Sequence, residues 1–303
     1  HISKIFNKKM KTVAIIGIGK WGKNLISQFS KICKIKYCYS KGDKSNILWL
    51  INNYPTINFC NNLDTILDDP SVDAVIIATP IITHYNLVMK ALISKKHVFV
   101  EKPITTTVTK ANKLLKIAKN NNLSLFVGSI FLYHPILKKL KIILQKEKIQ
   151  SLYLNWEKLG AFNEKLSFDL LTHYIIIVNE LVGIPKKIFV QKRIGIITDC
   201  DVLSLQMKFK KNLDCFIDIN RVSSMKHREI IIKTSKNLYL WKNEILFKFN
   251  KKKYSYQQFF APKTIPLENE CKEFLKHIKS TKKNYVNTQK SIDAIHIINK
   301  YIK

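Results

Sequence analysis

The sequence predicts an α/β protein, in which an N-terminal doubly wound parallel sheet is followed by an α+β region with antiparallel strands. Between residues 12 and 128, short apolar runs alternate with segments of helical periodicity, which is the pattern of βαβ units in a parallel sheet. After Gly128, strand-like runs follow one another with short polar turns between them. We therefore expect a first domain over residues 10–128 and a second over residues 129–303.

Six apolar segments of the first domain are predicted as strands and three amphipathic segments as helices. Residues 73–79 (DAVIIAT) are a continuous apolar run, as in strands buried on both faces of a parallel sheet. Leu87, Val88, Ala91 and Leu92 recur at the spacing of one helix face. The alternation implies right-handed crossovers. The expected strands are 12–17, 35–39, 57–60, 73–79, 97–100 and 123–127, and the expected helices are 21–30, 84–94 and 107–120.

The second domain is predicted to contain helices at both ends and consecutive strands between them. Short polar turns such as Ser235-Lys236-Asn237 join neighbouring strands, which predicts an antiparallel meander. The expected helices are 135–145, 168–182, 267–280 and 291–302, and the expected strands are 187–196, 202–210, 215–222, 229–234, 238–241 and 245–249.

Composition and charge exclude several classes of protein. The longest apolar runs fall far short of the roughly 20 residues of a membrane helix, so we expect a cytoplasmic protein without a membrane partner. The formal net charge is +31, but only three of the 52 basic residues are Arg, the residue that phosphate and base contacts favour. We therefore expect a solvated Lys surface and no nucleic-acid partner. The six cysteines form no CxxC pair, and no metal site is expected. The chain begins with His1, and we expect Met10 to be the natural start, because a predicted strand begins right after it.

The first motif with a chemical meaning is GIGKWG, which follows an apolar strand and opens a helix. In this context GxGxxG is the fingerprint of a dinucleotide-binding Rossmann fold, with the pyrophosphate at the helix N-terminus. The first glycine permits the tight turn, the second lets the backbone approach the pyrophosphate and the third lets the helix pack closely. We expect Gly17, Gly19, Lys20, Trp21 and Gly22 to bind the cofactor. The alternative is a tight strand-to-helix turn without a ligand.

The end of the second strand discriminates between NAD and NADP. NAD-binding folds usually place Asp or Glu there, about 20 residues on, to hold the ribose 2′-hydroxyl. Here Ser40 and Lys41 take that place, and a hydroxyl and a cation suit a 2′-phosphate. Asp43 follows slightly later and is the alternative ribose ligand, in which case Lys41 is one more surface Lys. The cofactor is therefore expected to be NADP or NAD, with NADP favoured.

Two further motifs carry titratable side chains. Glu101-Lys102-Pro103 follows a predicted strand at the edge of the sheet where ligands bind, so Lys102 could approach nicotinamide and substrate, with Glu101 orienting it. Asp169 and His173 lie four residues apart on a predicted helix and share a face. A His titrates near neutral pH and can take the proton of an alcohol as hydride leaves. The alternatives are an ordinary strand-end pair and a surface Asp beside a core His.

Taken together, these segments resemble the Gfo/Idh/MocA oxidoreductases, the family of glucose–fructose oxidoreductase and inositol 2-dehydrogenase, over roughly residues 11–303. VAIIGIGKWGKN is similar to the family's opening strand and glycine loop, and KKHVFVEKPIT to its EKP motif. FDLLTHYIIIVNELVGIPKKI is similar to the segment of its DxxxH motif, and PLENECKEFLKHI to its late helix. The resemblance implies a second domain with an open, mostly antiparallel sheet.

The resemblance also implies roles for single residues. Lys102 matches the EKP lysine between nicotinamide and substrate, His173 the general acid/base and Asp169 its acidic partner. Leu171 and Tyr174 depart from patterns common in the family, which leaves the substrate open. Residues matched to the cofactor cleft are Thr79, Pro80, His84 and Glu101, and candidate substrate contacts are Tyr133 and Lys158, together with His134 and Asn155.

The implied function is that of an NAD(P)-dependent oxidoreductase acting on CH–OH groups. It would transfer a hydride between nicotinamide and a secondary alcohol or ketone of a sugar, nucleotide-sugar or polyol-like substrate. A homodimer or tetramer through the open sheet is implied as well. The alternative is a non-catalytic NAD(P)-sensing regulatory protein on the same fold, which would need neither the EKP nor the DxxxH motif.

Overall fold

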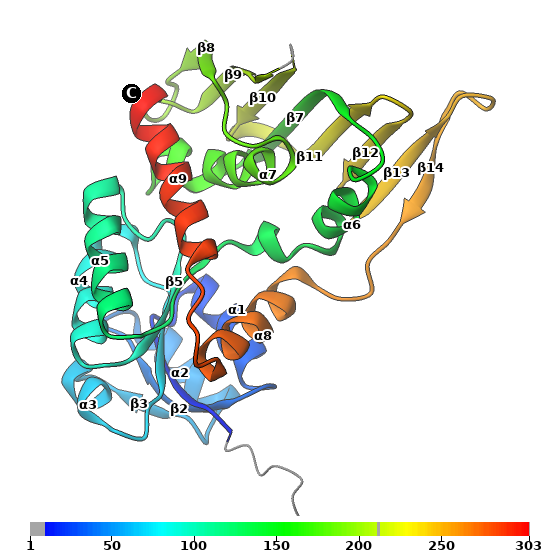
Figure 1. The fold of residues 1–303 in the computed structure, drawn as a ribbon. Helices are drawn as coiled ribbons and strands as arrows, with labels where there is room; N and C mark the ends of the chain where they lie inside the picture. Colours follow the sequence, from blue (N-terminus) through cyan, green and yellow to red (C-terminus); the bar gives the residue numbers. More distant parts are fainter. Residues whose placement is uncertain (1–9, 211–212, 303) are drawn as a thin grey trace, which may run out of the picture. The chain divides into compact units, whose positions relative to one another are not determined.

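The computed structural model describes residues 10–210 and 213–302, so the residues before Met10 lie outside it (Figure 1). The chain divides into two units. The first runs to Gly128 and takes in Glu270–Gln289, and the second holds Ser129–Asn269 and the residues from Lys290 onward. The segment Glu270–Gln289 thus packs with the first unit, whereas the sequence-based division places it in the second. The reason is that its apolar side chains complete the core of the first unit.

The first unit is built on a parallel sheet, which over the described residues has six strands in the order β3-β2-β1-β4-β5-β6. The strands are β1 (Thr12–Ile16), β2 (Lys34–Tyr39), β3 (Asn58–Cys60), β4 (Ala74–Ile77), β5 (His97–Glu101) and β6 (Leu125–Gly128). β1 pairs with both β2 and β4, so the strand order reverses there. In sheets of this order, ligands bind outside the carboxyl ends of the strands at the reversal. The predicted doubly wound parallel sheet is confirmed.

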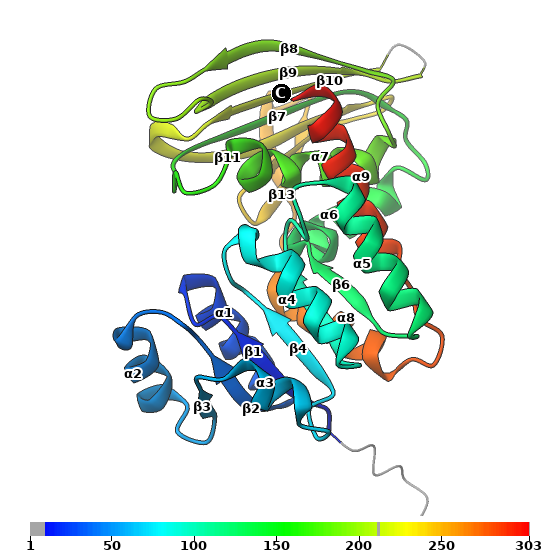
Figure 2. The ribbon, with the colours of Figure 1, turned by 90° about the vertical axis from the view of Figure 1, so that its left-hand side faces the viewer.

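Helices cover both faces of this sheet. Figures 1 and 2 show α4 and α5 on one face and α1 and α8 on the other. The buried ring of Phe274 on α8 lies 5.6 Å from the rings of Phe99 and Phe126 and 6.2 Å from that of Phe29. This aromatic cluster joins α1, α8, β5 and β6 in one core. The helices are α1 (Lys20–Phe29), α2 (Lys44–Asn53), α3 (Leu63–Asp68), α4 (Ile81–Ile93), α5 (Val108–Asn120) and α8 (Pro266–Lys279).

The second unit is built on a mixed sheet with the order β14-β13-β12-β11-β7-β10-β9-β8, eight strands over the described residues. The strands are β7 (Ile149–Leu159), β8 (Lys187–Ile194), β9 (Val202–Lys208), β10 (Asp214–Asn220), β11 (Val222–Thr234), β12 (Leu238–Lys242), β13 (Ile245–Asn250) and β14 (Ser255–Phe260). β7, which the sequence analysis does not predict, is parallel to β10 and antiparallel to β11. The predicted single meander is therefore wrong, because β7 separates β10 from β11. The other pairings are antiparallel, so the mostly antiparallel sheet is confirmed.

One face of this sheet is buried and the other is open. Leu203, Leu205 and Met207 of β9 are buried and alternate with partly exposed residues, the pattern of a strand covered on one side. Figure 2 shows β8, β9, β10, β7 and β11 running side by side. The helical elements of this unit are η1 (Ile130–Tyr133), α6 (Pro135–Ile143), the π turn η2 (Ser167–Leu171) and α7 (Thr172–Val182), and α9 (Val286–Tyr301) enters it from the first unit. None of the helices in the described residues is long and apolar enough to cross a membrane.

Candidate active site

The chain turns from β1 into α1 through three glycines with different surroundings. Gly17 has a φ of +104°, and a Cβ there would lie 2.4 Å from the carbonyl oxygen of Ala78. A Cβ on Gly22 would lie 2.1 Å from the carbonyl oxygen of Gly17. A Cβ on Gly19 would meet no atom within 4 Å. The packing of the described residues therefore demands glycine at positions 17 and 22, whereas at Gly19 it leaves open space.

α1 begins beside this open space, and all its residues are described. Its N-cap is Gly19, no side chain caps it and its first turn carries no acidic residue. Lys20 and Trp21, the first two helical residues, are exposed. The first N–H groups of a helix lack intrahelical partners, and together with the helix dipole they favour an anion. The uncapped N-terminus and the space at Gly19 fit the pyrophosphate of a dinucleotide.

The end of β2 lies next to the glycine turn. The backbone N–H of Gly17 donates to the carbonyl oxygen of Tyr39 at 2.8 Å. The next residues in the chain are Ser40, which is partly exposed, and Lys41, which is exposed. Both side chains therefore follow the strand at the edge where the ribose of a dinucleotide is expected.

Asp43, the alternative ribose ligand, caps a helix. Its carboxylate accepts a hydrogen bond from the N–H of Ser45 at 2.7 Å, as the N-cap of α2. Hydrogen bonding to Ser45 lowers the pKa of Asp43, and the nearby ammonium group of Lys23 lowers it further. Two lysines, Lys23 and Lys41, thus lie near the end of β2. The carboxylate of Asp43 is already hydrogen-bonded to the N–H of Ser45.

His84 joins the turn after β4 to the EKP segment. The side chain is 1% exposed, and its ring nitrogens lie 2.8 Å from the carbonyl oxygens of Thr79 and Pro103. Burial lowers the pKa of His84, so the neutral ring is favoured. The structure therefore places His84 inside the first unit, where it holds Thr79 and Pro103, whereas Thr79 and Pro80 themselves are accessible.

Glu101 ends β5 and connects the glycine turn to Lys102. Its carboxylate accepts a hydrogen bond from the indole N–H of Trp21 and another, at 3.3 Å, from the backbone N–H of Lys102. Gly128 leaves room for this carboxylate, since a Cβ there would lie 2.8 Å from Oε1. Burial raises the pKa of Glu101 to about 7. The charge beside Lys102 and Trp21 therefore changes near neutral pH.

Asp169 and His173 lie on a helix that begins with a π turn. Ser167–Leu171 forms this turn, α7 starts at Thr172, and the hydroxyl of Thr172 donates to the carbonyl oxygen of Ser167 at 3.0 Å. In a π turn the hydrogen bonds run from residue i to residue i+5, and such turns are frequent at functional sites. The predicted α-helix is therefore locally wider, which still leaves residues four apart on the same side. Both Asp169 and His173 are partly exposed.

Aromatic rings and cations of the second unit surround His173. Its ring centroid lies 5.0 Å from that of Phe131 and 5.8 Å from that of Trp156. The guanidinium carbon of Arg228 lies 4.9 Å from the Phe131 centroid and 5.7 Å from the Trp156 centroid. The ammonium nitrogen of Lys158 lies 5.7 Å from the Trp156 centroid. The structure therefore brings Lys158 and His173 to the same indole ring.

The other candidate substrate contacts have different environments. Tyr133 ends η1 and is partly exposed. His134 is buried, with Nδ1 accepting from the N–H of Ile136 and Nε2 2.8 Å from the carboxylate of Glu244. Asn155 neighbours Trp156 along β7, so its side chain lies on the opposite, open face of the sheet. Asn155 therefore faces away from the rings around His173, which corrects its grouping with Lys158.

Sequence comparison assigns the first of these sites to a family. A model of the oxidoreductase family GFO_IDH_MocA, described by an NAD-binding Rossmann fold, matches residues 11–129. Over these residues, which are less than half of the chain, the sequence matches the Gfo/Idh/MocA oxidoreductases. The uncharacterized oxidoreductase YrbE of Bacillus subtilis is 27% identical over 147 residues, which are 48% of this chain and 43% of that protein. A dTDP-3,4-didehydro-2,6-dideoxy-α-D-glucose 3-reductase of Saccharopolyspora spinosa is 36% identical over 87 residues, 29% of this chain and 26% of that protein. The matched segments thus span less than half of these relatives.

Solved structures share the fold over nearly the whole chain. UDP-N-acetylglucosamine 3-dehydrogenase from Acidithiobacillus ferrooxidans has a TM-score of 0.85 at 18% identity and covers 95% of both chains. A 3-ketoreductase from Actinomadura kijaniata, in complex with TDP-benzene and NADP, has a TM-score of 0.83 at 15% identity and covers 96% of both chains. At such identities the likeness shows the fold alone. Both units of the chain therefore share the fold of these solved structures.

The Gfo/Idh/MocA motifs did not point to Arg228, Trp156 and Phe131. A signal for Arg228 was present in the composition, because it is one of three Arg among 52 basic residues. A planar guanidinium stacks on rings and presents a fork of donors, which Lys does not do. A second Arg, Arg221, is buried and pairs with Asp201 at 2.9 Å. Arg228 and Arg221 thus stand where a guanidinium has specific partners, whereas the third arginine, Arg193, forms an exposed pair with Asp199 at 3.2 Å.

Proposed function

We propose that the protein is an NAD(P)-dependent oxidoreductase acting on a CH–OH group, which interconverts a secondary alcohol and a ketone in a sugar, nucleotide-sugar or polyol-like substrate. The observation that carries this proposal is the glycine turn, where α1 begins uncapped beside the open space at Gly19. The names of similar proteins, a dTDP-sugar 3-reductase and a UDP-N-acetylglucosamine 3-dehydrogenase, support a sugar-like substrate.

The proposed chemistry divides between a few side chains. When bound, the cofactor supplies the nicotinamide ring that accepts or donates hydride. His173 exchanges the proton of the substrate hydroxyl, because an imidazole titrates near neutral pH. Asp169, on the same side of the helix, orients His173 or binds the substrate. Lys102, next to Glu101, supplies positive charge that stabilises the substrate oxygen as it loses its proton.

We further propose NADP as the preferred cofactor. Ser40 and Lys41 follow β2 where NAD-specific folds usually place an acidic residue. Lys23 adds a second cation near this strand end, and the carboxylate of Asp43 is held by Ser45. A hydroxyl and two ammonium groups suit a 2′-phosphate better than a 2′-hydroxyl.

The test is a titration of the protein with NADPH and with NADH, following nicotinamide fluorescence and quenching of Trp21. We expect NADPH to bind at least about tenfold more tightly, which is 1.4 kcal/mol. Lys41→Gln should remove most of this preference, whereas Lys113→Gln on the exposed side of α5 should leave it unchanged. A preference for NADH would contradict the NADP proposal. Binding of neither nucleotide would contradict the proposed function as a whole.

We also propose that the protein forms a homodimer or tetramer through the open face of the second unit. The register of the strands places Phe189, Phe216, Tyr153, Ile231 and Leu240 in one row across this face, with Gln206 between the first two. Phe189, Tyr153 and Phe216 are 43%, 36% and 41% exposed. Light scattering should give a mass of two or four chains, and Phe216→Lys should lower it. A monomeric wild type would contradict the proposal.

A further inference from the structure

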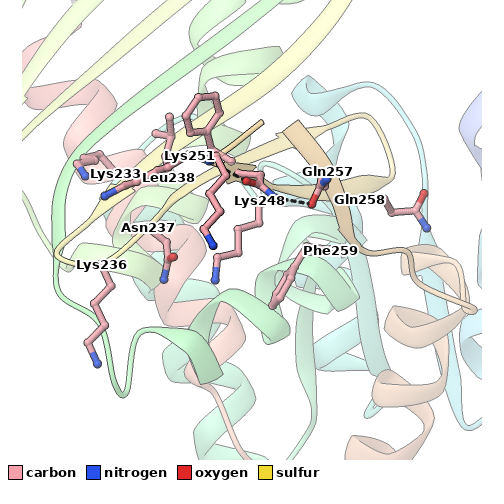
Figure 3. A pocket seen from close by; sticks show the side chains of 12 residues that line it. Lys233, Lys236, Asn237, Leu238, Lys248, Lys251, Gln257, Gln258 and Phe259 are labelled. Atoms are coloured by element: carbon pink, nitrogen blue, oxygen red, sulfur yellow. Dashed lines mark hydrogen bonds between the residues drawn. The ribbon is translucent and has the colours of Figure 1, made fainter. Parts of the chain in front are cut away.

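A lysine-lined cavity of about 760 Å³ lies at one end of the second unit's sheet, among β11 to β14 and the turns that join them (Figure 3). Five of its twelve described lining residues are Lys and none is acidic. The five are Lys233, Lys236, Lys248, Lys251 and Lys252. None of the residues assigned above to cofactor or substrate lines this cavity, so the proposed oxidoreductase activity does not account for it.

The positive charge of the cavity is not neutralised by ion pairs. Among the described residues, none of the five lysines has a carboxylate within salt-bridge distance, whereas Lys141 pairs with Glu180 at 2.6 Å. The carboxylate of Glu147 lies in this region and interacts electrostatically with Lys248. Its oxygens accept hydrogen bonds from three neutral side chains: Thr234 at 2.5 Å, Asn237 at 2.7 Å and Tyr239 at 3.1 Å. Glu147 therefore offsets the lysine charge only in part.

An aromatic ring and a hydrogen-bonded turn lie among these cations. The ammonium nitrogens of Lys139 and Lys248 lie 5.6 and 5.9 Å from the centroid of Phe259. The side-chain oxygen of Asn250 accepts from the N–H of Lys252 at 2.9 Å, and its amide donates to Gln257 at 3.1 Å. These bonds fix the turn that carries Lys251 and Lys252. These contacts thus position Lys248 and the backbone of the turn that carries Lys251 and Lys252.

Several of the lining side chains lie on one side of the strands. In Figure 3, Lys236, Asn237, Lys248 and Lys251 extend to the same side of the strands, while Gln258 points away. A volume of this size falls in the range of about 300–1,000 Å³ that is typical of small-molecule sites. Several separated ammonium groups match a ligand with several negative oxygens, and the amide of Asn237 adds a hydrogen-bonding group.

We propose that this cavity binds the pyrophosphate group of a small molecule, either inorganic pyrophosphate or a nucleoside diphosphate. A single carboxylate would contact one or two of these ammonium groups, whereas a pyrophosphate spans several of them. The same lysines repel one another in the empty cavity, and the bound polyanion removes that repulsion.

The first test is calorimetric titration of the full-length protein with inorganic pyrophosphate, without cofactor or metal, at an ionic strength of about 0.15 M. The Lys248→Gln/Lys251→Gln variant should bind about tenfold more weakly, since exposed charge pairs each change affinity by a few-fold. The matched variant Lys113→Gln/Lys116→Gln removes the same charge from α5 and should stay within about twofold of wild type. Absence of binding, or equal losses in both variants, would overturn the proposal.

A second measurement locates the ligand. Lysines are acetylated with and without pyrophosphate, and each site is quantified by peptide mass spectrometry. Pyrophosphate should protect Lys248 and Lys251 but not Lys113. Protection of Lys20 alone would place the anion at the glycine turn and would refute the cavity. Repeating the labelling with ADP distinguishes the ligand sources, because protection of Lys248 and Lys251 by ADP shows that a nucleoside diphosphate is accepted. Neither measurement involves hydride transfer. Pyrophosphate binding at this cavity can therefore be tested whether or not the protein is an oxidoreductase.

Discussion

Replacing Gly19 by Ala distinguishes an effect on ligand binding from an effect on folding. A Cβ at this position meets no atom within 4 Å of the described structure, and the φ of −70° and ψ of −176° are open to Ala. The cost to folding is confined to the N-cap of α1, where Ala is disfavoured against Gly by about 1 kcal/mol or less. We therefore expect the Tm of Gly19→Ala to fall by about 2–4 °C at most.

Cofactor affinity should change far more than stability. The added methyl group occupies the space through which a pyrophosphate reaches the N–H groups of α1. Loss of one charge-assisted hydrogen bond costs about 1.5–3 kcal/mol, which raises Kd roughly 10- to 150-fold. Fluorescence titration with NADPH measures this change, and thermal unfolding confirms that the variant is folded.

Two variants control this experiment. Thr107→Ala changes the N-cap of α5, which likewise has no side-chain capping bond, and should leave NADPH binding unchanged. Gly22→Ala places a Cβ 2.1 Å from a backbone oxygen and should disrupt the turn itself. A folded Gly19→Ala protein that binds NADPH as tightly as wild type would refute the assignment of this space to the cofactor.

Three further predictions follow from the site and the core. Lys102→Met should abolish turnover and His173→Asn should lower kcat by about 10²–10⁴-fold, with NADPH Kd almost unchanged; full activity of either in steady-state assays would contradict its role. Because the pKa of Glu101 is raised to about 7, the folded state holds its proton more tightly than the unfolded state, and this contribution to stability is lost as pH rises through 7. Glu101→Gln should therefore match the wild-type Tm near pH 4 and exceed it by about 5–10 °C at pH 8, and a difference independent of pH would count against this pKa. Phe274→Ala should lower the free energy of unfolding by about 3–5 kcal/mol in urea titrations, against less than about 1 kcal/mol for exposed Ile93→Ala; equal losses would show that the ring cluster is not a core.

The strands of the first unit were predictable because each one appears in the sequence as a local apolar run. All four residues of β4 are buried, and the sequence shows them as one apolar run. The glycine pattern likewise predicts the shape of the turn. A Cβ at position 17 or 22 would collide with a backbone oxygen, so both positions require glycine. Helices α2 and α3 were missed for the opposite reason. Leu50 is the single buried residue of α2, and α3 has six residues, so neither shows a long apolar face.

The second unit was harder because its organisation depends on distant pairings. β7 lies between β10 and β11, and no local pattern states that Leu154 pairs with both Ile217 and Ile230. The π turn before α7 has only five residues, which are too few for its wider spacing to show in the sequence pattern. His84 was matched by position in a motif, and only the structure shows that backbone carbonyls occupy both of its ring nitrogens.

The return of α8 to the first unit sets the order in which the protein can be made. A ribosome releases Phe29, Phe99 and Phe126 long before it reaches Phe274, the ring that closes their cluster. At about 5–20 residues per second, the roughly 150 intervening residues take on the order of 10–30 s. During that time the nascent first unit presents an unfilled aromatic groove, which is a binding surface for chaperones and a starting point for aggregation. Fusions or truncations that delay or remove α8 therefore act first on the half of the protein that is synthesised earliest.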